Sequence, residues 1–193
     1  MKKIILVLII ILAAFLRLYR LSDYPMGLNA DEAALGYNAY SLLLTGRDEH
    51  GHSWPVNLES FGDFKPAGYA YLLIPFIKIF GLTEFAVRLP SALFGILAVY
   101  FIYLLVKELS TESCALISAA LLAVSPWHLH FSRGGWEVNV ATTLMLIGVW
   151  LFLKKRFELC ALSFALSMYT YQSARLVVPL LGIGLFYLYR PKR

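Results

Sequence analysis

The sequence predicts an all-α protein: a multi-pass transmembrane helical bundle with amphipathic interfacial helices in its first extracytoplasmic loop. Of its 193 residues, 60% are apolar and only 15% are charged, whereas soluble domains carry about 25% charged residues. The mean hydropathy is +0.69. Apolar runs bounded by basic residues are typical of membrane helices. The net charge of +5 therefore reflects membrane orientation, and we expect no nucleic-acid partner.

Six apolar runs are predicted to be the membrane spans. The first, residues 4–16, begins like a signal peptide, but two arginines follow it instead of a small-residue cleavage motif, so we expect an uncleaved span. Several runs are shorter than the roughly 20 residues that cross a bilayer unaided, so they must include flanking residues. The later runs are residues 85–105, 115–124, 138–152, 157–171 and 176–189.

The basic residues predict that both termini are cytoplasmic, because lysine and arginine collect in cytoplasmic loops. The extracytoplasmic face then carries the long loop of residues 22–84 and, against the usual bias, Arg88, Arg133 and Arg175. We expect a cell-membrane protein with an extracytoplasmic active face, in which residues 1–193 form one transmembrane domain that is part of a larger enzyme. The cytoplasmic clusters are residues 2–3, Lys107, residues 154–156 and residues 190–193.

The long outer loop is predicted to contain two helices. Residues 31–44 repeat apolar positions at helical spacing, and Gly46 provides a stop signal. Residues 68–80 are apolar and aromatic but short and interrupted by a proline, which favours a helix in the membrane interface over a span.

Asp31 and Glu32 form a carboxylate pair at the start of the first of these helices. One interpretation is structural: Asn29 and Glu32 have the spacing of a capping box, and the helix dipole favours negative charge in a first turn. Capping accounts for Glu32 better than for Asp31. The other interpretation is catalytic, because a carboxylate at a membrane face can serve as a general base. We carry both residues as catalytic candidates.

Four basic residues are candidates for binding a lipid phosphate. Each has an ordinary alternative, since Lys65 could be a solvated loop residue and the arginines interfacial anchors. Together they could hold a phosphate leaving group by charge-assisted hydrogen bonds. These candidates are Lys65, Arg88, Arg133 and Arg175.

Two pairs of histidines raise the possibility of a bound divalent metal ion, which the sequence alone leaves open. His50 and His52 stand two residues apart in a polar loop and are the first candidates, although a zinc site needs three or four ligands. The pair His128 and His130 more closely resembles interfacial aromatic residues. The two cysteines are expected to act as small apolar residues.

Several short motifs occur in an order and at spacings that one family shares. They are residues 16–21, Asp31-Glu32 with Tyr37, residues 64–66, residues 80–90, and Ser125-Pro126 followed by Ser132-Arg133. On these motifs the chain resembles the N-terminal half of an integral-membrane GT-C glycosyltransferase, of the group that includes protein O-mannosyltransferases and lipid A aminoarabinose transferases.

The resemblance implies particular roles. Asp31 would be the catalytic base, with Glu32 its neighbour, and Glu137 would lie near the active cavity. Lys65 would approach the lipid phosphate, in a Lys-Pro-Pro element whose second proline is Ala67 here.

The implied activity is inverting transfer of a sugar from a polyprenyl-phosphate donor to an acceptor hydroxyl at the outer membrane face. The expected partners are that lipid-linked sugar, the bilayer and a second polypeptide that completes the enzyme. The alternative is a non-catalytic membrane subunit that binds the lipid carrier, or a transporter fragment. Ionisable groups gathered at one face fit both a transferase and a binding subunit.

Overall fold

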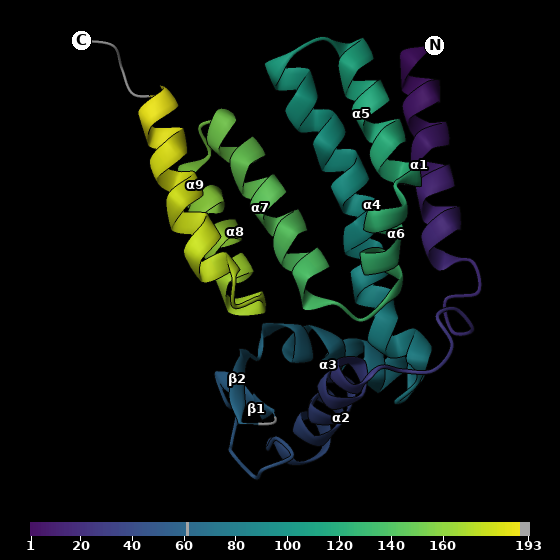
Figure 1. The fold of residues 1–193 in the computed structure, drawn as a ribbon, viewed down its shortest axis with the longest axis vertical. Coiled ribbons are helices and arrows are strands. Elements are labelled where there is room, and N and C mark those ends of the chain that lie inside the picture. The colour runs from purple at the N-terminus through teal and green to yellow at the C-terminus, as the bar shows by residue number, and fades with distance from the viewer. Residues whose placement is uncertain (61, 190–193) are drawn as a thin grey trace.

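The computed structural model describes residues 1–60 and 62–189 and is mostly helical. Seven of its helices form a bundle in which most axes run along the long dimension of the molecule, and the rest of the chain forms a layer across one end (Figure 1). The bundle helices are α1 (Lys2–Leu18), α4 (Glu84–Leu109), α5 (Glu112–Val124), α6 (Pro126–Arg133), α7 (Glu137–Leu153), α8 (Phe157–Thr170) and α9 (Ala174–Tyr189).

The layer across the end, which we call the outer layer, comprises the long loop between α1 and α4. Its elements are α2 (Ala30–Thr45), β1 (Asn57–Ser60), β2 (Asp63–Pro66) and α3 (Gly68–Phe80). Both helices predicted in this loop are confirmed, α2 to within a residue at each end and α3 at its predicted bounds. The antiparallel hairpin of β1 and β2 was not predicted.

Local signals set the ends of α2. The Asn29 side chain accepts a hydrogen bond from the backbone N–H of Glu32 at 2.9 Å, and Glu32 accepts one from the backbone N–H of Asn29 at 3.0 Å. This is the predicted capping box. At the other end Gly46 takes a left-handed conformation with φ of 69°, which glycine adopts without a steric penalty.

Two buried clusters hold the molecule together. One joins the outer layer to α4 and α7, with Leu35, Tyr69, Leu73 and Val87 in its centre. The other joins α1, α4 and α5 around Val99. The first cluster attaches the layer that carries α2 to the bundle.

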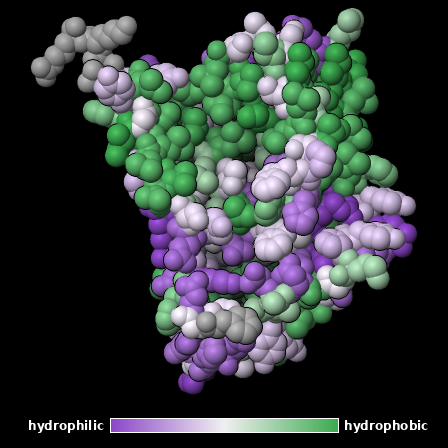
Figure 2. All heavy atoms as spheres, in the orientation of Figure 1, coloured by the Kyte–Doolittle hydropathy of each residue, from purple (hydrophilic) through white to green (hydrophobic). Residues whose placement is uncertain are grey.

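The surface changes character between bundle and outer layer. Figure 2 shows a mainly hydrophobic bundle and a more hydrophilic outer layer on the same face. Large apolar side chains such as Ile4, Leu121 and Leu180 are exposed on the bundle. Among the described residues, α4 alone is long and apolar enough to cross a membrane by itself, and α5 with α6 would be a second candidate if this bent pair is one span.

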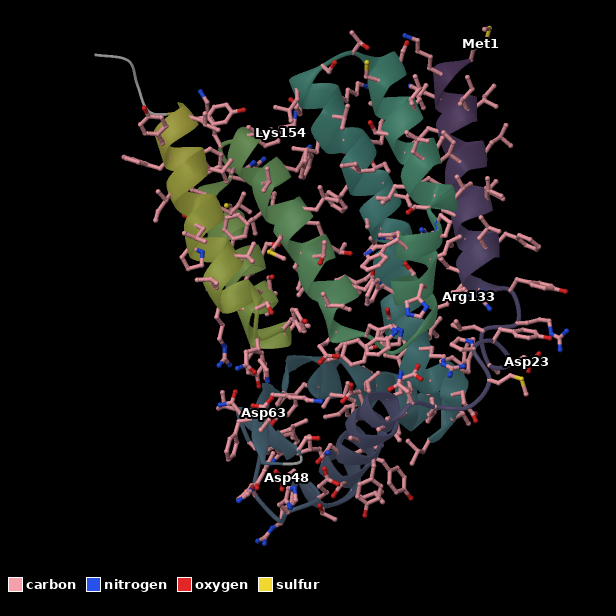
Figure 3. The ribbon with its side chains drawn as sticks, viewed as in Figure 1. Met1, Asp23, Asp48, Asp63, Arg133 and Lys154 are labelled. Carbon is pink, nitrogen blue, oxygen red and sulfur yellow. The ribbon has the colours of Figure 1, made fainter. Side chains whose placement is uncertain are left out.

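Six of the helices lie where the six spans were predicted. The segment between α5 and α7 differs from the prediction. Between the predicted spans 115–124 and 138–152 no helix was predicted, but most of residues 127–136 belong to α6, which is bent by 57° relative to α5. Met1 and Lys154 lie at one end of the bundle, whereas Asp48 and Asp63 lie in the outer layer at the other (Figure 3). This arrangement agrees with the predicted alternation of loops.

Candidate active site in the outer layer

Asp31 and Lys65 form an ion pair between the first turn of α2 and strand β2. Their side chains are 42% and 28% exposed, so the pair is reachable from solvent. The hydrogen bond to Asp31 raises the pKa of Lys65 above its ordinary value, with further contributions from the charges of Glu137 and Asp63. Lys65 therefore remains charged and holds the Asp31 carboxylate in place.

Lys65 also borders an open cavity of about 370 Å³. The cavity lies where β2, the start of α7 and the turn between α8 and α9 meet, and burial raises the pKa of Glu137 in its wall. The lining residues are Asp63, Lys65, Pro66, Glu137, Tyr171, Gln172 and Ser173. The predicted candidates Lys65 and Glu137 thus meet at one hollow, and Asp31 joins them through Lys65.

Arg175 stands next to this cavity. It is the second residue of α9, and its Nη2 donates a hydrogen bond to Asn57 Oδ1 at 3.0 Å, which ties α9 to β1. The Arg175 side chain is otherwise exposed, and it supplies a second positive charge near the cavity besides Lys65.

Glu32 has a different environment from its neighbour Asp31. It is 1% exposed, and its Oε1 accepts hydrogen bonds from Arg88 Nε at 2.9 Å and from the Gly135 N–H at 2.7 Å. Burial alone would raise the pKa of Glu32, but the hydrogen bonds from Arg88, Gly135 and Asn29 outweigh it and lower that pKa. The capping interpretation of Glu32 is confirmed, and this carboxylate is too enclosed to meet a substrate.

Arg88 does not fit the predicted phosphate site. Its guanidinium is fully buried and is engaged by Glu32 and by backbone carbonyls of the segment after α1, so Lys65 and Arg88 do not share an open site. The carbonyls that accept from Arg88 are those of Leu21, Ser22, Pro25 and Gly27. Arg88 therefore stabilises Glu32 and this segment.

Arg133 is likewise occupied by backbone carbonyls. Its guanidinium clamps the end of α1 and the segment that follows, and Figure 3 shows it beside the end of the bundle that faces the outer layer. The accepting carbonyls are those of Leu16, Tyr19, Arg20 and Tyr24. Of the four basic candidates, Lys65 lines the cavity, and Arg175 follows two residues after the lining residue Ser173.

His50 and His52 belong to a loop organised by Asp48. The buried Asp48 carboxylate accepts from the backbone N–H groups of both histidines, and His52 Nδ1 lies 3.2 Å from Asp48 Oδ2. In the part of the chain that the structure describes, no three or more His, Cys, Asp or Glu side chains are grouped to hold a metal ion. Sequence reasoning also missed Gly135, whose N–H orients Glu32; the Gly134-Gly135 pair was its signal.

The class of protein to which this helical chain belongs is given by a comparison with known families. Residues 64–192 match the family described as dolichyl-phosphate-mannose-protein mannosyltransferase. The match covers more than half of the 193 residues, so the chain belongs to this mannosyltransferase-like family of GT-C type. The matched range includes Lys65, Glu137 and Arg175, whereas Asp31 lies before it. No curated protein matches the chain.

Proposed function

We propose that this chain carries the catalytic base of an inverting glycosyltransferase that uses a polyprenyl-phosphate-linked sugar as donor. The reaction would take place at the extracytoplasmic face of the cell membrane, where a hydroxyl group accepts the sugar. Family membership supports the transfer chemistry. The observation that carries the assignment is the half-exposed Asp31 carboxylate, paired with Lys65 beside an open cavity.

Asp31 suits the role of general base. Its carboxylate would accept the proton of the acceptor hydroxyl as that oxygen attacks the anomeric carbon. The bond from this carbon to the phosphate oxygen breaks on the opposite side, which inverts the configuration and releases the lipid phosphate. Lys65 fixes the carboxylate without enclosing it, because about two fifths of the Asp31 side chain stays exposed.

The leaving phosphate would be stabilised by positive charge at the cavity. Arg175 is suited to this task, since its exposed side chain lies close to the cavity and a cation lowers the energy of a departing anion. Lys65 stays paired with Asp31, on the side of the attacking hydroxyl. The carboxyl of Glu137 would add repulsion if ionised. Because burial raises its pKa, the neutral form of Glu137 is favoured more than in an exposed carboxyl.

A stereochemical assay tests the proposal. The protein, together with the polypeptide expected to complete the enzyme, is incubated with a synthetic polyprenyl-phosphate sugar of known anomeric configuration and an acceptor, and the product's configuration is determined by NMR. We expect inversion, and we expect Lys65→Met to reduce turnover by about 10²-fold or more. The matched control is Lys78→Met, which removes an exposed lysine from the last turn of α3. Retention, or lipid binding without any transfer, would contradict the proposal; the second result would favour a carrier-binding subunit.

A further inference from the structure

Arg17 is a buried charge that the proposed chemistry does not use. It lies in the last turn of α1 and is 0% exposed. None of the salt bridges among the described residues includes Arg17, and its Nε has no hydrogen-bond partner there, although burying an unpaired charge is costly. Its position therefore needs a structural reason.

Arg17 donates to the carbonyl of Ala13 in its own helix at 3.1 Å and to backbone carbonyls where α5 ends. Nη1 donates to the carbonyl of Ala123 at 3.1 Å, and Nη2 donates to the carbonyl of Leu122 at 3.2 Å. In a continuous helix the carbonyl of Leu122 would accept from residue 126, but Pro126 has no N–H. Arg17 thus satisfies carbonyls that the bend exposes, and its charge faces the negative end of the α5 dipole.

Arg17 also contacts α6 on the far side of the bend. Its Nη2 lies 2.8 Å from His128 Nδ1, and the same nitrogen of His128 lies 3.2 Å from Ser132 Oγ. Helix α4 passes this junction at Gly95, where an added Cβ would lie 2.3 Å from Ser132 Oγ and 3.0 Å from Arg17 Nε. One guanidinium therefore joins α1, α5 and α6 in a tightly packed place.

The bend between α5 and α6 determines the position of the residues that follow α6 and contact the candidate site. Two residues after α6, the N–H of Gly135 donates to Glu32 Oε1 at 2.7 Å. Glu32 caps the helix turn that carries Asp31. Contacts therefore run without a break from Arg17 through α6 to the first turn of α2.

We propose that Arg17 is a positioning residue: it fixes the bend between α5 and α6 and thereby holds the Gly135 N–H, Glu32 and the first turn of α2 in register. Its effect on turnover rests on the proposed function, because only then does the position of Asp31 matter for chemistry. Its effect on structure does not depend on that function.

Hydrogen exchange of the full chain, purified in detergent micelles, tests the structural part. For Arg17→Met we expect exchange about tenfold faster over residues 125–136 and in the first turn of α2, with α8 and α9 unchanged. The control Arg20→Met removes an exposed arginine one turn further along, paired with Asp23, and should change neither segment. Wild-type exchange over residues 134–136, or equal acceleration in every helix, would overturn the proposal.

If Arg17→Met does not fold, the variant Arg17→Lys tests the positioning role instead. A lysine keeps the charge but cannot bridge the carbonyl of Ala123 and the His128 ring as a planar guanidinium does, so we expect a smaller acceleration in the same two segments. In transfer assays this variant should lower kcat and leave KM nearly unchanged, and a rise in KM with kcat unchanged would count against the positioning role. An absence of transfer by the wild-type protein would contradict the proposed function and leave the exchange result standing.

Discussion

At the residue scale, two adjacent carboxylates have separate tasks because α2 turns them into different surroundings. Asp31 points to Lys65 and stays half exposed, whereas Glu32 is enclosed by Arg88, Gly135 and Asn29. An exposed carboxylate can take a proton from a substrate, and an enclosed one contributes to stability. The adjacency of Asp31 and Glu32 in the sequence therefore does not make them a catalytic pair.

Glu32 should contribute to stability in a pH-dependent way. The folded-state pKa of Glu32 lies below its ordinary value of 4.5, so the folded state binds a proton less readily than the unfolded chain does. Its contribution is complete above about pH 4.5 and is lost as the pH falls through the folded-state pKa. We expect Glu32→Gln to lower the free energy of unfolding by about 3 kcal/mol at neutral pH.

Thermal melts from pH 3 to pH 7 measure this contribution. The difference in melting temperature between wild type and Glu32→Gln should shrink as the pH falls below about 4.5. A difference that stays constant over this range would show that the Glu32 charge is not what stabilises the fold.

At the element scale, the cavity depends on how closely α3 approaches α8. Gly68, the first residue of α3, lies so near α8 that an added Cβ would be 2.5 Å from the carbonyl oxygen of Tyr169. A backbone atom cannot move aside as a flexible side chain can. This contact sets the spacing between the end of β2, where Lys65 lies, and the turn that supplies Tyr171.

Gly68→Ala should therefore disturb the cavity. We expect a loss of about 1–3 kcal/mol in the free energy of unfolding, because overpacking forces backbone shifts, together with weaker donor binding. The control is Gly182→Ala in α9, where no described atom would lie within 4 Å of the new Cβ; there we expect no loss of stability. Chemical denaturation of both variants checks this prediction, and equal effects would contradict it.

The elements also show why part of the molecule could be predicted from sequence. Helix α2 has its own start and stop signals in Asn29, Glu32 and Gly46, so its bounds could be predicted from the sequence. The hairpin of β1 and β2 has four-residue strands, which are too short for a clear alternating pattern. The pairing of Arg88 with Glu32 joins residues 56 positions apart, and no local pattern shows which carboxylate an arginine will meet.

At the scale of the whole molecule, an apolar bundle supports a polar layer at one end. Composition and the runs of apolar residues predicted the bundle, and the position of the basic residues predicted which loops lie together (Figures 2 and 3). The cavity could not be predicted in the same way, because it is formed by β2, α7 and the turn before α9. These elements come together only through tertiary packing.

The predicted topology can be checked by cysteine labelling. In a Cys114→Ser background, which removes the exposed native thiol, an impermeant reagent added outside intact cells should label His50→Cys and not Lys155→Cys. Both positions are exposed and lie in loops at opposite ends of the bundle. The reverse pattern would place the cavity on the cytoplasmic side and contradict the proposed active face.

The assignment of Asp31 as the catalytic base can be tested by a single substitution. Asp31→Asn keeps the size of the side chain but removes its ability to accept the proton. General-base assistance is worth roughly 10²–10⁴-fold in rate, so sugar transfer from a polyprenyl-phosphate donor should fall by that factor while the melting temperature and donor binding change little. Glu32→Gln should instead lower the melting temperature more than the turnover of the molecules that remain folded. Wild-type transfer by the Asp31→Asn protein would show that Asp31 is not the catalytic base.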